Sequence, residues 1–179
     1  MEEIGIKPKL DLKRYWDLSS SYYGRVEETF EDRLPKIVSG KILDWGCSIG
    51  FTSKELSILY PNCSITGLDI SFFKKWPKEE KNISFVQGDG YFPPFKEETF
   101  DAVFCMNNLT LLLERTRDYN EFIKKSVLSI GSLVKPKGYL IFSDCDSWKI
   151  FQKESKNFKV HSHSDRIRPA LDFFNLWLT

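Results

Sequence analysis

The sequence predicts an α/β protein with a mostly parallel central sheet and helices on both faces. Three observations carry this prediction. Short apolar runs of strand length alternate with longer segments of helical spacing. Gly, Pro or Asn, residues that favour turns, bound most of the runs. The chain has 179 residues, of which 41% are hydrophobic, which suits one globular domain with a substantial core.

The predicted strands are short and rich in β-branched or aromatic residues. The strand expected at residues 64–70 follows the turn signal Pro61-Asn62, and the one at 82–87 alternates polar and apolar residues before Gly88. The strand at 138–143 follows the turn sequence that ends at Gly138. A sixth segment, residues 158–163, is ambiguous and could form an edge strand. The five main strands are expected at residues 41–45, 64–70, 82–87, 100–105 and 138–143.

The predicted helices precede the first strand or lie between strands, and proline ends three of them. A leading helix is expected over residues 20–34, before Pro35, and another over 51–60, before Pro61. A short helix is expected over 71–76. The clearest helical spacing covers residues 115–134. Residues 169–178 fit the period of neither a strand nor a helix well.

The composition argues against several kinds of partner. Lys and Arg number 26 and Asp and Glu 25, so the net charge of +1 gives no field to attract nucleic acid or an acidic membrane. No apolar run approaches ~18 residues, so we expect no membrane span. The four cysteines form no Cys-x-x-Cys pair and the start shows no signal peptide. We therefore expect no metal site and a cytoplasmic location.

Three polar, glycine-containing segments follow predicted strands. The first runs from Asp44 to Gly50, the second is Asp69, and the third is Gly88-Asp89-Gly90. Ligands of open parallel sheets bind outside the carboxyl ends of the strands, so these segments should meet at one place. Each carboxylate also has a simpler explanation, because Asp44 could cap a helix and Asp69 or Asp89 could close a turn.

The chemistry of these segments suits an adenosine-like ligand. Gly46 permits a tight turn and close approach of a ligand to the backbone. Asp69 can accept hydrogen bonds from both hydroxyls of a ribose, while Asp89 can accept one from an exocyclic amine. The dinucleotide fingerprint would need glycine where Ser48 and Phe51 stand, and this argues against a nicotinamide-dependent oxidoreductase. The first loop also lacks a basic residue for phosphate, which favours S-adenosylmethionine.

Four motifs in order resemble the class I S-adenosylmethionine-dependent methyltransferases, especially the small-molecule group. Ser48 replaces the middle glycine of the first motif. The resemblance covers about Lys41 to Ser143. The motifs are Leu43-Asp44-Trp45-Gly46-Cys47-Ser48-Ile49-Gly50, Gly67-Leu68-Asp69-Ile70-Ser71, the Gly88-Asp89-Gly90 to Phe95 segment with Thr99-Phe100-Asp101, and Lys135-Pro136-Lys137-Gly138-Tyr139-Leu140.

The resemblance implies a Rossmann-like methyltransferase fold with S-adenosyl-L-methionine as the cofactor. Residues 1–38 would form an N-terminal lid, residues 39–146 the cofactor-binding core, and residues 147–179 a substrate-side segment. The tail after Ser143 is short for a helix plus the closing antiparallel strand pair of this family. The implied cofactor-binding residues are Asp44, Gly46, Cys47, Gly50, Asp69, Ile70, Asp89, Gly90, Met106 and Asn107.

No catalytic residue is evident, because methyl transfer needs chiefly an acceptor held close to the methyl group. Candidates are Asn108, Tyr22 and Tyr23, although Asn108 could instead cap a helix and the tyrosines could anchor one. We expect a small-molecule methyl acceptor. A protein partner or a second copy could complete the site, because no separate substrate domain is visible. The alternative is a non-catalytic or partner-dependent subunit that binds S-adenosylmethionine on the same fold.

Overall fold

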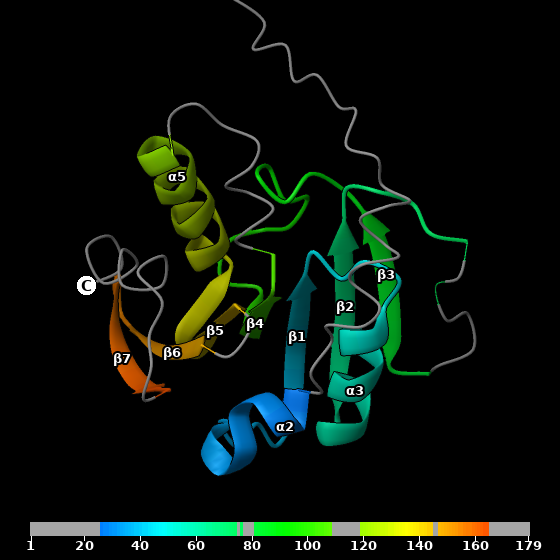
Figure 1. Ribbon diagram of the computed structural model, residues 1–179, viewed down its shortest axis with the longest axis horizontal. Coiled ribbons are helices and arrows are strands. Elements are labelled where there is room, and N and C mark those ends of the chain that lie inside the picture. Colours follow the sequence, from blue (N-terminus) through cyan, green and yellow to red (C-terminus); the bar gives the residue numbers. More distant parts are fainter. Residues whose placement is uncertain (1–25, 75, 77–80, 109–118, 145–146, 165–179) are drawn as a thin grey trace, which may run out of the picture.

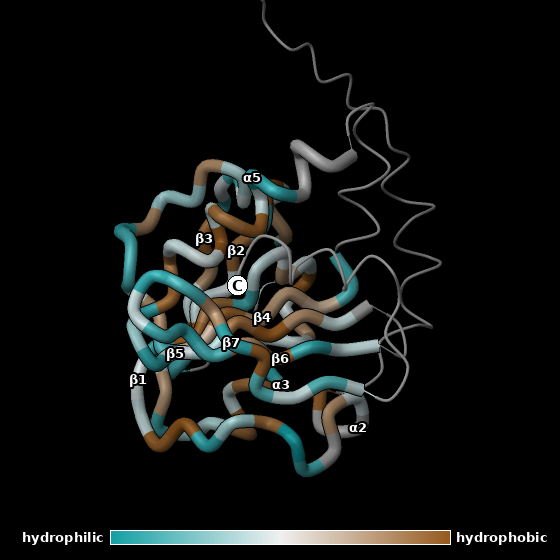
Figure 2. Tube along the Cα trace, turned by 90° about the vertical axis from the view of Figure 1, so that its left-hand side faces the viewer, coloured by the Kyte–Doolittle hydropathy of each residue, from teal (hydrophilic) through white to brown (hydrophobic). Residues whose placement is uncertain are grey.

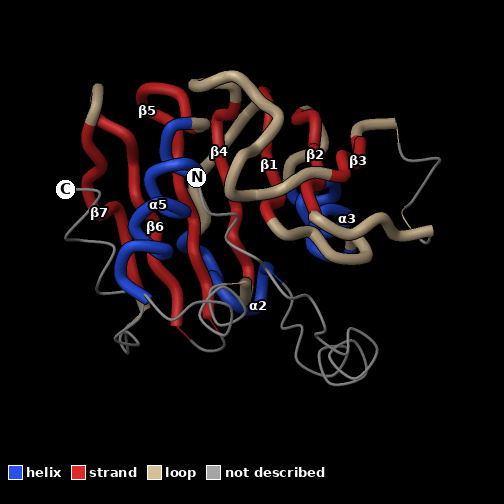
Figure 3. Tube along the Cα trace, turned by 90° about the horizontal axis from the view of Figure 1, so that it is seen from above, coloured by secondary structure: helices blue, strands red, loops and turns tan. Residues whose placement is uncertain are grey.

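A single seven-stranded sheet forms the centre of the protein (Figure 1). The computed structural model describes residues 26–74, 76, 81–108, 119–144 and 147–164. The strand order is β3-β2-β1-β4-β5-β6-β7 (Figure 3). The strands are β1 (Gly40–Trp45), β2 (Cys63–Asp69), β3 (Ile83–Gln87), β4 (Phe100–Met106), β5 (Val134–Asp144), β6 (Ser147–Glu154) and β7 (Asn157–His163).

The five predicted main strands are confirmed, and they pair in parallel. Strand β1 pairs with β2 on one side and with β4 on the other, so the strand order reverses at β1. In sheets of this kind a ligand binds at the carboxyl end of such a switch. Loops that follow β1 to β4 therefore occupy the position expected of a binding site.

Helices cover both faces of the sheet, as the alternation predicts. Helices α2 (Val26–Phe30) and α3 (Phe51–Leu59) pack on one face, where Leu56 of α3 joins a buried cluster with Ile42 of β1. Helix α5 (Tyr119–Ser132) packs on the other face through Val127 and Ile130. Figure 2 shows hydrophobic stretches in the central strands, among them β2 and β4. No helix in the described ranges has the length and apolar character of a membrane span.

The leading helix is shorter than predicted within the described residues. It covers Val26–Phe30, and a 3-10 turn, η1 (Glu31–Arg33), follows it before Pro35. The expected helix over residues 71–76 is wrong, because the described residues there form bends and turns. Trp76 explains this difference. Its indole is buried, stacks on Phe85 of β3 at 5.0 Å and anchors the segment to the sheet.

The chain after β5 forms an antiparallel hairpin, which the sequence predicted only in part. Strand β7 matches the edge strand offered for residues 158–163, but β6 was not predicted. Lys149 and Lys153 interrupt the apolar run of β6, yet both are buried in the sheet. Asp144 pairs with Ser147 at the start of the hairpin, so no helix separates β5 from β6. This connection fits the strand pair into a short tail.

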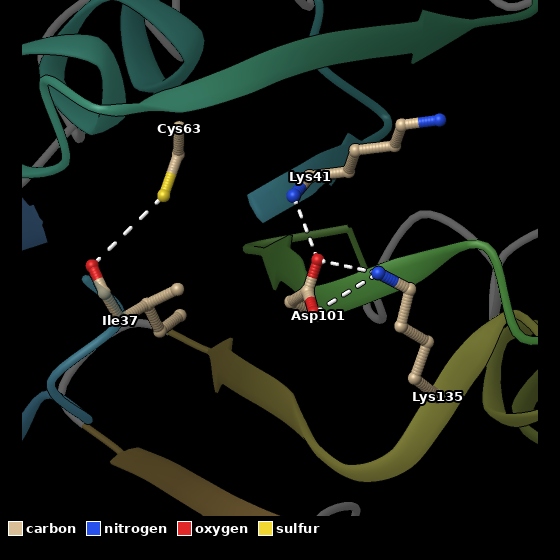
Figure 4. A network of polar contacts seen from close by, with 5 residues as sticks. All are labelled: Ile37, Lys41, Cys63, Asp101 and Lys135. Atoms are coloured by element: carbon tan, nitrogen blue, oxygen red, sulfur yellow. Dashed lines mark hydrogen bonds and ion pairs between the residues drawn. The ribbon is translucent and has the colours of Figure 1, made fainter. Parts of the chain in front are cut away.

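At the amino ends of β1 and β4, Asp101 joins three parts of the chain (Figure 4). Its Oδ2 accepts a hydrogen bond from the backbone N–H of Lys41 at 2.8 Å, and the Lys135 Nζ lies 2.9 Å from the same oxygen. A Cβ on Gly40 would lie 2.4 Å from that oxygen. Lys135 stands in a four-residue bulge of β5, between the register pairs Phe100–Val134 and Ala102–Tyr139. Asp101 therefore stabilises the sheet at the end opposite the predicted site.

Candidate cofactor site

The loops that follow β1, β2, β3 and β4 contact one another at the carboxyl edge of the sheet (Figure 1). The amide of Gly46 donates to the Leu68 carbonyl at 2.7 Å, and the amide of Gly88 donates to the Asp69 carbonyl at 2.8 Å. Asn108, which follows β4, donates from its side chain to the Gly46 carbonyl at 3.1 Å. The structure thus brings all the predicted segments together.

The first loop is unusual because three of its five residues have left-handed backbone. Gly46, Ser48 and Gly50 have φ of 74°, 53° and 91°. Glycine adopts this region without a steric penalty, whereas serine does not. Ser48 stands where the resembled motif has glycine, so its conformation must be held by neighbours.

Two contacts hold the peptide groups of Ser48 in place. Its N–H donates to Oδ2 of Asp69 at 2.9 Å, and its carbonyl accepts a hydrogen bond from Trp76 Nε1 at 2.7 Å. The indole of Trp76 is in turn packed against the rings of Phe72 and Phe85. Trp76, which lies 28 residues after Ser48, therefore supports the first loop. No local pattern in the sequence indicates this contact.

Asp69 receives hydrogen bonds from both sides of its own loop. Besides the Ser48 amide on Oδ2, the amide of Ser71 donates to Oδ1 at 2.8 Å. The turn-closing role that the sequence offered as an alternative is thus part of what Asp69 does. Both oxygens of Asp69 thus take part in the structure of the loop, and a carboxylate can accept several hydrogen bonds at once. Ile70, the next residue, exposes 51% of its surface beside this carboxylate.

Asp44 is buried on the α3 face and accepts a hydrogen bond from the backbone N–H of Ser53 in the first turn of that helix, which is part of the capping role that the sequence offered. Its Oδ2 accepts a hydrogen bond from Ser53 Oγ at 2.6 Å, while Gly50 is the N-cap and makes no side-chain cap. Burial raises the pKa of Asp44 to about 7, the Ser53 hydrogen bond opposes this rise, and the Asp69 charge adds to it. A cationic ligand would favour the ionised form.

The third segment combines a turn with close packing. The exposed Asp89 accepts a hydrogen bond from the Tyr91 amide on Oδ1 at 2.8 Å, the turn that the sequence gave as its simpler explanation. The carbonyl of Gly90 accepts a hydrogen bond from Trp45 Nε1 at 3.2 Å. A Cβ on Gly90 would lie 2.6 Å from the Trp45 indole. Trp45, which the sequence did not single out, thus explains why residue 90 is a glycine.

The last residue of β4 and the two residues that follow it contact β5 or the first loop. Met106 is buried, and its sulfur accepts a hydrogen bond from Ser143 Oγ at 3.3 Å. Asn107 has a left-handed φ of 54°, and its amide donates to the Ser143 carbonyl at 2.9 Å. The Asn108 amide lies against Gly46, where a Cβ would be 2.4 Å from Asn108 Nδ2. The close approach expected of a ligand at Gly46 is thus made by the protein itself.

The remaining predicted residues differ in what they can contribute. Cys47 is buried, and this burial raises the pKa of its thiol far above the usual range, so it stays protonated. Within the described ranges, no group of three His, Cys, Asp or Glu side chains could hold a metal ion. Tyr22 and Tyr23 lie outside the described residues.

The residue chemistry at this edge fits a cationic nucleoside without phosphates. Carboxylates of Asp44, Asp69 and Asp89 lie in the three segments, and no Lys or Arg occurs in residues 44–50, 69–73 or 88–92. Carboxylates can accept from ribose hydroxyls and from ammonium groups, and they stabilise a positive charge nearby. These are the groups that S-adenosylmethionine presents.

Comparison with known proteins identifies the family. A family model described as a methyltransferase domain matches residues 42–138, more than half of the chain. Malonyl-[acyl-carrier protein] O-methyltransferase of Legionella pneumophila is 40% identical over 82 residues, which cover 39% of this chain and 26% of that enzyme. The tRNA N(3)-methylcytidine methyltransferase of Schizosaccharomyces pombe is 27% identical over 165 residues, which cover 78% of this chain and 62% of that enzyme.

A solved structure shows the same fold. The complex of the Haloferax volcanii Trm112 methyltransferase activator with a putative methyltransferase aligns with a TM-score of 0.57 at 17% identity. The alignment covers 77% of this chain and 61% of that chain. This chain thus covers less than two thirds of the length of the relatives described above. Its fold and its family-model match together show that it belongs to the class I methyltransferases, the family whose cofactor is S-adenosylmethionine.

Proposed function

We propose that this chain binds S-adenosylmethionine at the carboxyl edge of β1 to β4 and transfers its methyl group to a small-molecule acceptor. The observation that supports this most is the hydrogen bond from the Ser48 amide to Asp69, at 2.9 Å. It places the carboxylate proposed for the ribose directly against the loop proposed for the methionine part. The two halves of one ligand would therefore meet two connected elements.

The proposed roles follow the positions of the residues. Asp69 would accept hydrogen bonds from the ribose hydroxyls, because a half-buried carboxylate at a strand end can face both. The exposed Ile70 would pack on the adenine, and the Asp89-Gly90 turn would bind its polar edge. The first loop, with Asp44, Gly46, Cys47 and Gly50, would border the methionine part, and Met106 and Asn107 would close that end.

When bound, S-adenosylmethionine supplies a methyl group on a positively charged sulfur for an in-line displacement. The leaving sulfur becomes neutral, so no residue of the chain has to protonate it. The loops' contribution is to fix the ligand and to exclude water, which brings an acceptor within ~3–3.5 Å of the methyl group. The two tyrosines at positions 22 and 23 stay candidates for contacts with the acceptor, whereas the side-chain amide of Asn108 contacts the carbonyls of Trp45 and Gly46.

The proposal of a small-molecule acceptor is supported by the charge of the chain. A net charge of +1 gives no general attraction for polyanions such as RNA, although one of the relatives methylates tRNA. Incubation of the full chain with labelled S-adenosylmethionine and either a panel of small acids and acyl esters or total tRNA tests this. Labelling of a small acceptor supports the proposal, and labelling of tRNA alone contradicts it.

A partner-dependent subunit is the second candidate, and the likeness to a methyltransferase in complex with an activator favours it. On this account the chain binds S-adenosylmethionine but transfers the methyl group only in the presence of another protein. The same assay, repeated with extract of the source cells from which small molecules have been removed, separates the two. Activity that needs the extract supports the partner-dependent form.

The division of the chain and its location are proposals of the same kind. Residues 1–38 are proposed as a lid and residues 147–179 as a substrate-side segment, of which the first part forms β6 and β7 of the sheet. Cys47, Cys63 and Cys105 are buried thiols without disulfides among the described residues. They support a reducing, cytoplasmic compartment.

A further inference from the structure

We infer that Asn108 is a positioning residue that fixes the shape of the first loop, residues 46–50, and this inference rests on the proposed function. The side chain follows β4 and reaches back to the end of β1. Its Nδ2 lies 2.7 Å from the Trp45 carbonyl oxygen and 3.1 Å from the Gly46 carbonyl oxygen. A primary amide has two N–H donors, so both are used by consecutive carbonyls of one loop.

The backbone conformation of Asn107 directs the Asn108 side chain toward the end of β1. Asn107 adopts φ of 54°, a left-handed conformation that asparagine tolerates better than most residues. Its amide donates to the Ser143 carbonyl of β5 at 2.9 Å. The chain therefore turns sharply as it leaves β4, anchored to β5, and Asn108 comes to lie over β1. The loops after β1 and β4 are joined by a side chain, not by adjacency alone.

Gly46 provides the space that the Asn108 amide occupies. A Cβ there would lie 2.4 Å from Nδ2 and 2.9 Å from Oδ1 of Asn108, so only glycine leaves room for the amide. Gly46 also has φ of 74°, and the peptide groups on both sides of that rotation end in the carbonyls that Asn108 binds. The amide thus fixes the direction of both carbonyls at the point where the loop begins its left-handed turns.

These contacts assign a role different from substrate binding. With both amide hydrogens donated to the loop, Asn108 has no hydrogen left to offer to an acceptor molecule. Its effect on methyl transfer should come through the geometry of residues 46–50, which would border the methionine part of the cofactor. Loss of the amide should therefore weaken cofactor binding, even though the side chain acts through Gly46.

The test compares binding of S-adenosylhomocysteine by the full chain and its variants in calorimetry. We expect Asn108→Ala to bind ~5- to 30-fold more weakly, the range of one or two lost hydrogen bonds. Asn108→Asp has the same size but sets a carboxylate against two carbonyl oxygens, so it should bind more weakly still. The matched control is Asn82→Ala, because Asn82 Nδ2 also contacts two carbonyl oxygens, at 3.5 and 3.3 Å, but lies before β3, away from the site.

A double-mutant cycle on stability checks the contact independently of any ligand. Gly46→Ala should destabilise the wild-type chain more than it destabilises Asn108→Ala, because the overlap with the amide is then gone. Equal affinity of Asn108→Ala and wild type, or tighter binding by Asn108→Ala, overturns the inference. Tighter binding would mean that the Asn108 amide occupies space that the ligand needs. If wild type itself binds no S-adenosylhomocysteine, the proposed function fails, and the cofactor role of Asn108 fails with it.

Discussion

The amide of Ser48 donates a hydrogen bond to Oδ2 of Asp69 at 2.9 Å, which joins the loop after β1 to the end of β2. Ser48 has left-handed backbone, and Asp69 ends the neighbouring strand β2. One carboxylate therefore both restrains a strained loop and faces the proposed ribose position. A change at Asp69 should consequently affect the shape of the site and its chemistry together.

Asp69→Asn should weaken binding of S-adenosylhomocysteine by about 1–3 kcal/mol, because the amide loses charge and one acceptor. The matched variant is Asp101→Asn. Asp101 also accepts a backbone N–H, from Lys41, but at the opposite end of the sheet (Figure 4). We expect Asp101→Asn to lower the free energy of unfolding and to leave affinity unchanged in calorimetry. Equal affinities for both variants would contradict the placement of the site.

Trp76→Phe should loosen the first loop, because it removes the hydrogen bond from Nε1 to the Ser48 carbonyl. We expect a loss of about 1–2 kcal/mol in the free energy of unfolding by urea, together with weaker ligand binding. Tyr60→Phe is the control. It removes a side-chain hydrogen bond to the Pro35 carbonyl, remote from the site, and should lower stability alone. Unchanged affinity of Trp76→Phe would argue against support of the loop by the indole.

Gly90→Ala should destabilise the fold by ~1–3 kcal/mol, since its Cβ would meet the buried Trp45 indole at 2.6 Å. Gly88→Ala should cost less, because its nearest neighbours lie at 3.1 Å and include the side chain of Pro94. Trp45→Phe, which shortens the ring, should recover part of the Gly90→Ala loss. Urea unfolding of the single and double variants measures this coupling, and additive losses would rule out the contact.

Asp44 predicts a pH dependence of stability. Its pKa rises from 3.8 to about 7 on folding, so between these values the folded chain holds a proton that the unfolded chain has lost. The free energy of unfolding should therefore fall as pH rises through this window and level off above about 7. The contribution is at most about 4 kcal/mol, by the free energy of a three-unit shift.

Asp44→Asn tests this origin, because the amide stays neutral and its oxygen can still accept from Ser53. The variant should match wild type below about pH 4, where Asp44 is protonated in both states, and be more stable than wild type at pH 8. Urea unfolding at several pH values checks it. If the free energy of unfolding changed with pH in the same way in both proteins, a group other than Asp44 would cause the pH dependence.

Local patterns predicted the fold well where burial followed secondary structure. The apolar runs ending at Trp45 and Asp69 became β1 and β2 because both faces of these strands are covered. Strand β6 escaped prediction because Lys149 and Lys153 stand at buried positions. The Lys153 ammonium lies 2.6 Å from the Val134 carbonyl, a contact between distant parts of the chain.

The site was predictable in composition but not in its internal contacts. The spacing of the three segments after β1, β2 and β3 predicted that Asp44, Asp69 and Asp89 gather at one edge, and they do. The sequence did not indicate that Trp76 and Asn108 hold the first loop, because both contacts join residues 28 or more positions apart. It also explained Gly46 by a ligand, whereas a protein side chain takes that space.

The most direct test of the central claim is calorimetric titration of the wild-type full chain with S-adenosylhomocysteine, with NADH as the comparison. The account predicts saturable binding of about one S-adenosylhomocysteine per chain, lost or weakened in Asp69→Asn, and no comparable binding of NADH. Absence of binding by a folded chain, or tighter binding of NADH, would contradict the proposal that these loops form a site for S-adenosylmethionine.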